Sequence, residues 1–106
     1  MEANIEIAQS FFKKNKYQET IDVCNQILST ENNSIEALKL IARSFLAINK
    51  IKKARIYFNK VLNLKSDDFE VIKDLGNTYQ AIGEINNAKK HYQQAIAINA
   101  SYAPAL

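Results

Sequence analysis

The feature of this sequence that most restricts its fold is an internal repeat of 34 residues. At that spacing the 106-residue chain divides without gaps into units 1–34, 35–68 and 69–102, with 103–106 left over. Matching positions agree in type: small at position 8 (Ala8, Ala42, Gly76), aromatic at 11 (Phe11, Phe45, Tyr79), and small at 20 (Thr20, Ala54, Ala88). A repeat of this length indicates stacked units, each of which covers the apolar face of its neighbour.

Within each unit, apolar residues recur at spacings of three and four, which predicts two amphipathic helices and no strand. We expect first helices near 2–14, 35–48 and 69–82, and second helices near 18–30, 52–64 and 86–98. Asn15, Asn49 and Gly83 tolerate the left-handed conformation that ends a helix, and Ser34 and Asp68 are good N-caps. Polar residues 99–101 are expected to end the third unit. The prediction is one all-α domain over 1–106, a right-handed superhelical solenoid.

These columns resemble the tetratricopeptide repeat, a family of 34-residue helix-turn-helix units. The third unit fits the pattern best and the second follows closely; their residues are Ile72, Leu75, Gly76, Tyr79, Ala88, Tyr92 and Ala95, and Leu38, Ile41, Ala42, Phe45, Ala54, Phe58 and Val61. The first unit departs at Asn4, Thr20 and Cys24, as expected of a terminal repeat with one uncovered face. All three units lack the proline near the end of the family's pattern.

The last residues look like the opening turn of a truncated fourth unit, beginning with Tyr102 and continuing over 103–106. The polar-faced helix that usually closes members of this family is not in the sequence. We therefore hypothesise a fragment of a longer protein, which leaves open that the module is an accessory part of a larger regulatory protein with a catalytic domain elsewhere.

Composition indicates which cellular compartment and which classes of partner to expect. No apolar run approaches the roughly 18 residues of a membrane span, so no membrane partner is expected. The first six residues do not resemble a signal peptide. Cys24 is the only cysteine, so no internal disulfide can form, and the chain is expected to be cytoplasmic. Net charge is +3, concentrated in the second unit, which carries eight basic and three acidic residues.

No signature of catalysis is present: there is no phosphate-binding loop, HExxH motif, nucleophile elbow or cluster of metal ligands. We expect no enzyme activity, cofactor or metal. His91 is expected to face solvent, and Cys24 to be a buried packing residue, because Phe58 and Tyr92 fill the same position in the other units. Lys50, Lys52, Lys53 and Arg55 raise the alternative of nucleic acid, which is not expected because no aromatic residues are interleaved with them.

The resemblance implies a function in protein binding. Family members bind partners in a concave groove lined by positions 2, 5, 9, 12 and 13 of the first helices. Carried over to this chain, these positions hold Glu2, Ile5, Gln9, Phe12, Lys13, Glu36, Lys39, Arg43, Leu46, Ala47, Glu70, Lys73, Asn77, Gln80 and Ala81. Such a groove fits a peptide with an apolar anchor near Phe12 and Leu46 and an acidic group near Lys39 and Arg43. Alternatively, these are ordinary surface residues that pair with one another, such as Glu36 with Lys39.

Two further expectations concern partners. Relatives that grip the C-terminal carboxylate of chaperones use Lys, Asn and Arg at places that hold Ile5, Gln9, Leu40, Glu70 and Asp74 here, so chaperone-tail binding is not expected. The alternative function is self-assembly, in which the uncapped C-terminal face stacks onto another copy through Tyr92, Ala95, Tyr102 and Leu106.

Overall fold

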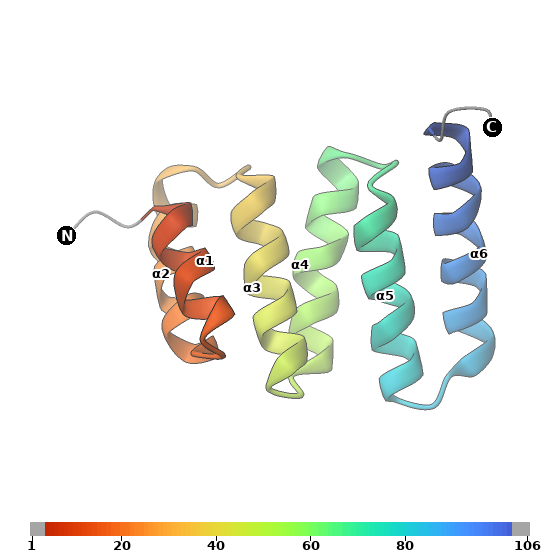
Figure 1. The fold of residues 1–106 in the computed structure, drawn as a ribbon, viewed down its shortest axis with the longest axis horizontal. Coiled ribbons are helices and arrows are strands. Elements are labelled where there is room, and N and C mark those ends of the chain that lie inside the picture. Colours follow the sequence, from red (N-terminus) through yellow and green to blue (C-terminus); the bar gives the residue numbers. More distant parts are fainter. Residues whose placement is uncertain (1–3, 103–106) are drawn as a thin grey trace.

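The computed structural model describes residues 4–102, and side chains up to residue 100. It contains six helices: α1 (Ile5–Lys13), α2 (Tyr17–Thr30), α3 (Ile35–Ala47), α4 (Ile51–Leu64), α5 (Phe69–Ala81) and α6 (Ile85–Tyr102). Between residues 4 and 102 there is no strand. Figure 1 shows three helical hairpins that follow one another in chain order along the long axis. The predicted all-α solenoid is confirmed.

The turn within each hairpin has the same backbone geometry in all three units. Asn15, Asn49 and Gly83 have φ of 61°, 64° and 80°, in the left-handed region predicted for them. The amide of the next residue donates back across the turn to the carbonyl of the aromatic column, at 2.9 Å for Phe11, 2.8 Å for Phe45 and 2.9 Å for Tyr79. This is the Schellman motif, which satisfies carbonyls that a helix end leaves without partners.

The starts of α3 and α5 also follow the prediction. The Ser34 hydroxyl accepts a hydrogen bond from the Ala37 amide, and an Asp68 carboxylate oxygen accepts one from the Val71 amide. The first unit differs, because α1 begins at Ile5 rather than near residue 2. Asn4 is extended and its side chain caps the Ile7 amide, so the N-cap lies four positions later than in the other units.

The end of the third unit was predicted wrongly. Helix α6 continues to Tyr102 through residues 99–101, which were expected to form a linker. This stretch contains Ala100, a strong helix former, and neither glycine nor proline occurs between Gly83 and Pro104. Polar composition alone did not mark an end of this helix.

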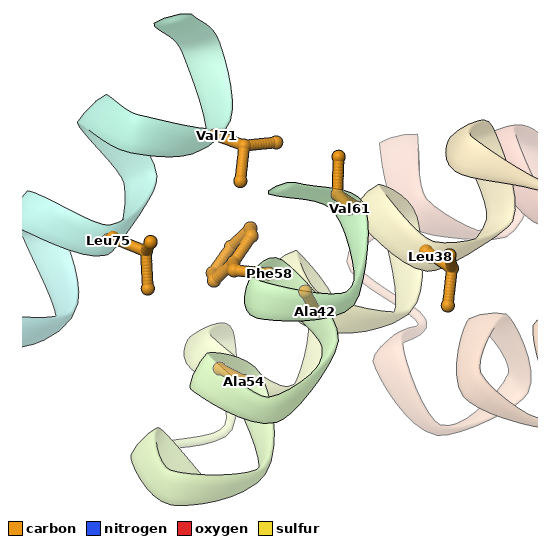
Figure 2. Close-up of a cluster of buried hydrophobic side chains, with 7 residues drawn as sticks. All are labelled: Leu38, Ala42, Ala54, Phe58, Val61, Val71 and Leu75. Atoms are coloured by element: carbon orange, nitrogen blue, oxygen red, sulfur yellow. The ribbon is translucent and has the colours of Figure 1, made fainter. Parts of the chain in front are cut away.

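The core lies between successive units. Phe58 and Val61 of α4 are fully buried against Val71 and Leu75 of α5, and Ala42 and Ala54 let α3 and α4 approach closely. Figure 2 shows Phe58 between α4 and α5. A second cluster holds Ala8, Ile21, Cys24, Leu40 and Ile41 between the first and second units. Each unit therefore completes the core of the one before it, as the small and aromatic columns predicted.

Candidate functional site

The groove positions lie on α1, α3 and α5, and α3 contacts both of the other two helices. None of the described groove residues is fully buried. Gln9, Lys13, Glu36, Ala47, Glu70, Lys73, Asn77, Gln80 and Ala81 are exposed, whereas Ile5, Phe12, Lys39, Arg43 and Leu46 are half-buried. Glu2 lies outside the described residues. The helical spacing thus brings these side chains to an accessible surface.

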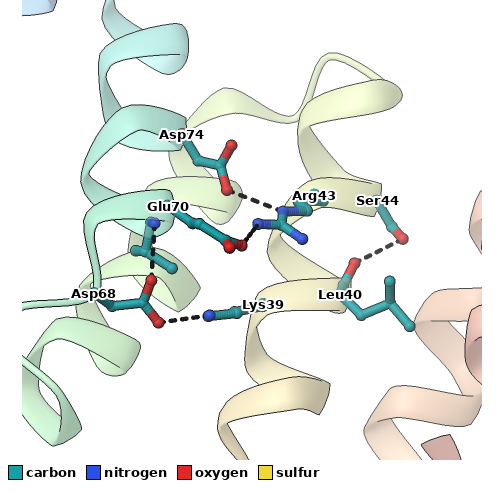
Figure 3. Close-up of polar contacts among 8 residues, drawn as sticks. Lys39, Leu40, Arg43, Ser44, Asp68, Glu70 and Asp74 are labelled. Atoms are coloured by element: carbon teal, nitrogen blue, oxygen red, sulfur yellow. Dashed lines mark hydrogen bonds and ion pairs between the residues drawn. The ribbon is translucent and has the colours of Figure 1, made fainter. Parts of the chain in front are cut away.

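Lys39, one of the two cations expected to receive an acidic partner, is already paired within the chain. Its Nζ lies 2.6 Å from Asp68 Oδ2, as Figure 3 shows. The other Asp68 oxygen accepts the Val71 amide at 3.2 Å, so one carboxylate caps α5 and binds α3. Asp68 is only 3% exposed. A carboxylate this deeply buried requires such partners, because desolvation of an unpaired charge costs several kcal/mol.

Arg43 makes the second bridge between α3 and α5. Its Nε donates to Asp74 Oδ2 at 2.9 Å, and its Nη2 lies 3.5 Å from Glu70 Oε2. Burial raises the pKa of Asp74 above its ordinary value, and the neighbouring Glu70 charge adds to this. The charges of Arg43 and Lys73 and the hydrogen bond from Arg43 oppose that rise. Arg43 therefore holds a partly buried carboxylate in place.

These bridges correct the expected electrostatics of the groove. Lys39 and Arg43 do not stand free for an acidic partner, and Lys39 pairs with Asp68 rather than with Glu36. Lys13 and Lys73 are exposed, and within the described side chains neither is in an ion pair. The sequence contained both members of each bridge. However, the two members of each bridge are 27 to 31 residues apart in sequence, and they meet only because α3 and α5 pack side by side.

The apolar patch predicted from Phe12 and Leu46 forms part of the edge of the core. The Phe12 ring meets Tyr17 edge-on with centroids 5.6 Å apart, and it packs against the second cluster, between the first and second units. Leu46 packs against the second-to-third unit core. Both side chains are half-buried, but they pack against different clusters, so a common apolar patch stays a prediction.

The C-terminal end of the groove is organised by Tyr92 of α6. Its hydroxyl lies 2.6 Å from Asn77 Oδ1 and 2.7 Å from Gln80 Oε1. Its ring packs on Gly76, where an added Cβ would lie 2.6 Å from Tyr92 Cε1. Gly76 therefore permits the close approach of α5 and α6. Tyr92 of α6 in turn holds the groove side chains of Asn77 and Gln80 in place.

A cavity of about 330 Å³ opens between α5 and α6, on the predicted self-association face. It is lined by Phe69, Glu70, Lys73, Tyr92, Ala95, Ile96 and Asn99. Ala95 is buried and Tyr92 half-buried, so neither offers the exposed surface expected of it, whereas Ile96 is 68% exposed. The side chain of Tyr102 and all of Leu106 lie outside the described part. Sequence reasoning missed Ile96, although it shares position 28 with Leu28 and Leu62.

The other two side chains considered for chemistry, Cys24 and His91, are both packed against neighbouring residues. Cys24 is fully buried, and burial raises the pKa of its thiol from the ordinary 9.0 to about 11. His91 is half-buried rather than solvent-facing: Nδ1 lies 2.8 Å from the Asn87 carbonyl oxygen, and the ring tilts against Tyr79 with centroids 5.0 Å apart. Residues 4–102 contain no group of side chains that could hold a metal ion.

Comparison with protein families agrees with the repeat. The tetratricopeptide repeat model matches residues 35–68 and 74–102, which is more than half of the chain. The chain belongs to the tetratricopeptide repeat family. The matches cover the second and third units, and the first, which departs most from the pattern, forms the same helical hairpin. No curated protein matches the chain in sequence.

Several solved structures share this tetratricopeptide fold at low identity. The second such domain of Spaghetti (RPAP3), bound to the HSP90 peptide SRMEEVD, has a TM-score of 0.81 and 18% identity over 88% of this chain and 86% of that chain. The Yersinia enterocolitica translocator chaperone SycD has a TM-score of 0.86 and 11% identity, over 91% of this chain and 73% of that chain. MamA from Desulfovibrio magneticus RS-1 has a TM-score of 0.85 and 13% identity, over 92% of this chain. This chain spans 55–72% of the MamA chains.

The positions that hold a carboxylate clamp in some tetratricopeptide proteins are occupied otherwise here. Leu40 is buried in the core between the first two units. Glu70 and Asp74 are the acidic partners of Arg43. Acidic side chains engaged in this way cannot take the place of cations that grip a carboxylate. That this module does not bind a chaperone tail stays a prediction.

Proposed function

We propose that this chain is a non-catalytic protein-interaction module that holds a peptide segment of its partner along α1, α3 and α5. The observation that carries the proposal is the continuous row of accessible groove side chains on three helices fixed relative to one another by buried packing and by the Lys39 and Arg43 bridges. A rigid, preformed surface binds an extended segment without the cost of ordering itself.

The bridges refine the chemistry of the partner. An apolar anchor of the peptide fits beside Phe12 and Leu46. An acidic group of the peptide is best received at Lys73, which is exposed and borders the 330 Å³ cavity. Binding an acid at Lys39 or Arg43 would require displacement of Asp68 or Asp74, which would leave a carboxylate unpaired.

The test is a selection of peptides from a displayed library, followed by fluorescence anisotropy with the chosen peptides. Leu46→Ala and Lys73→Gln should each weaken binding by roughly tenfold, in the range of moderate interface contacts. Asn59→Ala, an exposed change on the second helix α4, is the matched control and should leave the dissociation constant unchanged. Peptides that bind equally well to all three variants, or a selection that yields none, would rule out the groove.

Self-association is a second candidate because a large aliphatic side chain, Ile96, is exposed beside an open cavity. In this function a second copy covers Ile96 and Phe69. Light scattering over a wide concentration range should then show a molar mass that climbs above 12.0 kDa, and Ile96→Gln should abolish the climb. A constant 12.0 kDa mass would remove this candidate.

A further inference from the structure

The charges of this chain are divided between the two ends of its helices. We define the turn edge as residues 13–22, 47–56 and 81–90, which comprise the three within-unit turns and the first turns of α2, α4 and α6. These residues include nine basic and three acidic side chains, a net charge of +6, whereas the rest of the chain carries −3. Figure 1 shows the three turns together at the lower end of the molecule, with the connections between units at the upper end.

The lysines of the turn edge are available to a partner. Lys13, Lys14, Lys16, Lys50, Lys52, Lys89 and Lys90 are exposed, and among the side chains that the structure describes none of them is in an ion pair. Two further cations lie over aromatic rings, Lys53 over Phe45 and Arg55 over Tyr79. Lys39 and Arg43, outside the edge, are instead paired with Asp68 and Asp74 respectively.

Isoleucines accompany these lysines on the turn edge. Ile48 and Ile82 are the C-cap residues of α3 and α5, and Ile85 is the first residue of α6. They are 37%, 45% and 49% exposed. The turn does not require an isoleucine, because Lys14 fills the same C-cap position in the first unit and is followed by the same left-handed residue. Ile48 and Ile82 therefore have no evident part in forming the turns.

We infer that the turn edge binds the surface of an anionic lipid bilayer, with its lysines at the headgroups and Ile48, Ile82 and Ile85 inserted at the interface. Basic side chains beside apolar ones that enter the headgroup region are the combination that holds proteins at such surfaces. The expectation of no membrane partner rested on the lack of a spanning segment. Within residues 4–102 no helix is long and apolar enough to cross a membrane, and binding at the surface needs none.

The arrangement favours a bilayer over other anionic partners. The isoleucines stand on two turns, Ile48 on the second and both Ile82 and Ile85 on the third, of a molecule 45 Å long, whereas the centre of a protein interface is a contiguous packed patch. A fluid interface can accept each side chain separately. Nucleic acid gives the isoleucines no role, and the Tyr17 ring at this edge is engaged with Phe12 while its hydroxyl bonds Asn15, so it does not offer a stacking platform.

The experiment measures co-sedimentation of the whole chain with vesicles of phosphatidylcholine that contain phosphatidylserine, with pure phosphatidylcholine vesicles and single-stranded RNA alongside. Binding should require phosphatidylserine and weaken as salt is raised. Replacing Lys50, Lys52 and Lys53 by Gln should lower the partition coefficient by roughly two orders of magnitude, since each lysine near an anionic surface contributes about a factor of five.

Two further variants make the test specific. Ile48→Gln, Ile82→Gln and Ile85→Gln together keep the charge and should weaken partitioning by roughly tenfold. Replacing Lys60, Lys65 and Lys73 by Gln removes the same charge away from the turn edge and should change partitioning far less. Circular dichroism shows whether each variant is folded. Absence of binding to phosphatidylserine vesicles, insensitivity to the isoleucine changes, or preferential binding of RNA that ignores the isoleucines would each overturn the inference.

Discussion

Gly76 shows how one missing methyl group sets the position of a helix. An alanine there would gain about 1 kcal/mol in helix propensity, but its Cβ would lie 2.6 Å and 2.8 Å from two ring carbons of Tyr92. The ring cannot easily withdraw, because its hydroxyl is bonded to α5 through Asn77 and Gln80. The steric cost of about 1–3 kcal/mol is therefore expected to exceed the gain.

We predict that Gly76→Ala lowers the free energy of unfolding by about 1–2 kcal/mol, measured by urea denaturation. The control is the same change in a Tyr92→Ala background, where the ring is absent and the alanine should stabilise the protein by about 1 kcal/mol. A reversal of sign between the two backgrounds isolates the contact. Equal effects in both would show that the ring does not limit this position.

Cys24 provides a second prediction at the scale of a residue. It is fully buried, and its pKa of about 11 keeps the thiol protonated at neutral pH. We expect an aromatic disulfide reagent at pH 8 to react with the folded chain far more slowly than with the chain in urea, because the thiolate is the nucleophile. Reaction at similar rates in both states would contradict the buried position.

The same thiol links stability to pH. The folded-state pKa lies above the unfolded value of 9.0, so its contribution is complete below pH 9 and is lost as pH rises through about 11. A Cys24→Ala variant should therefore lack this part of the alkaline decline in unfolding free energy, although it also loses packing volume at every pH.

At the scale of elements, the starts of α3 and α5 form a matched pair. Ser34 caps α3 with a single hydrogen bond, while Asp68 caps α5 and also binds Lys39. We predict that Ser34→Ala costs about 1 kcal/mol of unfolding free energy and Asp68→Ala about 2–4 kcal/mol, because the second change leaves Lys39 without its partner. Asp68→Asn keeps a capping side chain and should fall between them.

The elements that could be predicted from the sequence are those fixed by local chemistry. The left-handed residues at 15, 49 and 83 and the caps at 34 and 68 follow from the type of a single side chain, and each is confirmed. The length of α6 and the start of α1 were wrong, because helix ends without glycine or a repeated cap carry a weak local signal. The ion pairs across α3 and α5 were missed because they depend on how two helices pack.

Across the whole molecule, burial is uneven and so should be local stability. Helix α1 has one buried residue, Ala8, whereas α3 has six. In a solenoid each unit is stabilised by its neighbours, and a terminal unit has only one. We predict that native-state hydrogen exchange finds the lowest opening free energies in α1 and the highest in α3 and α4. Uniform protection over all helices would instead indicate that the three units open together.

The bridge from Arg43 to Asp74 also fixes the order in which the units can be joined. Position 9 is Gln9, Arg43 and Asn77 in the three units, so only the second unit supplies a guanidinium to the unit that follows. If residues 35–68 were excised, the helices would still be in register, but Asp74 would face Gln9 and lose its partner. Because Asp74 is only partly buried, losing its partner should cost less than the about 3–5 kcal/mol expected for a fully buried pair. The units of this chain share a shape but are not interchangeable, because the charged residues of the second unit match only the unit that follows it.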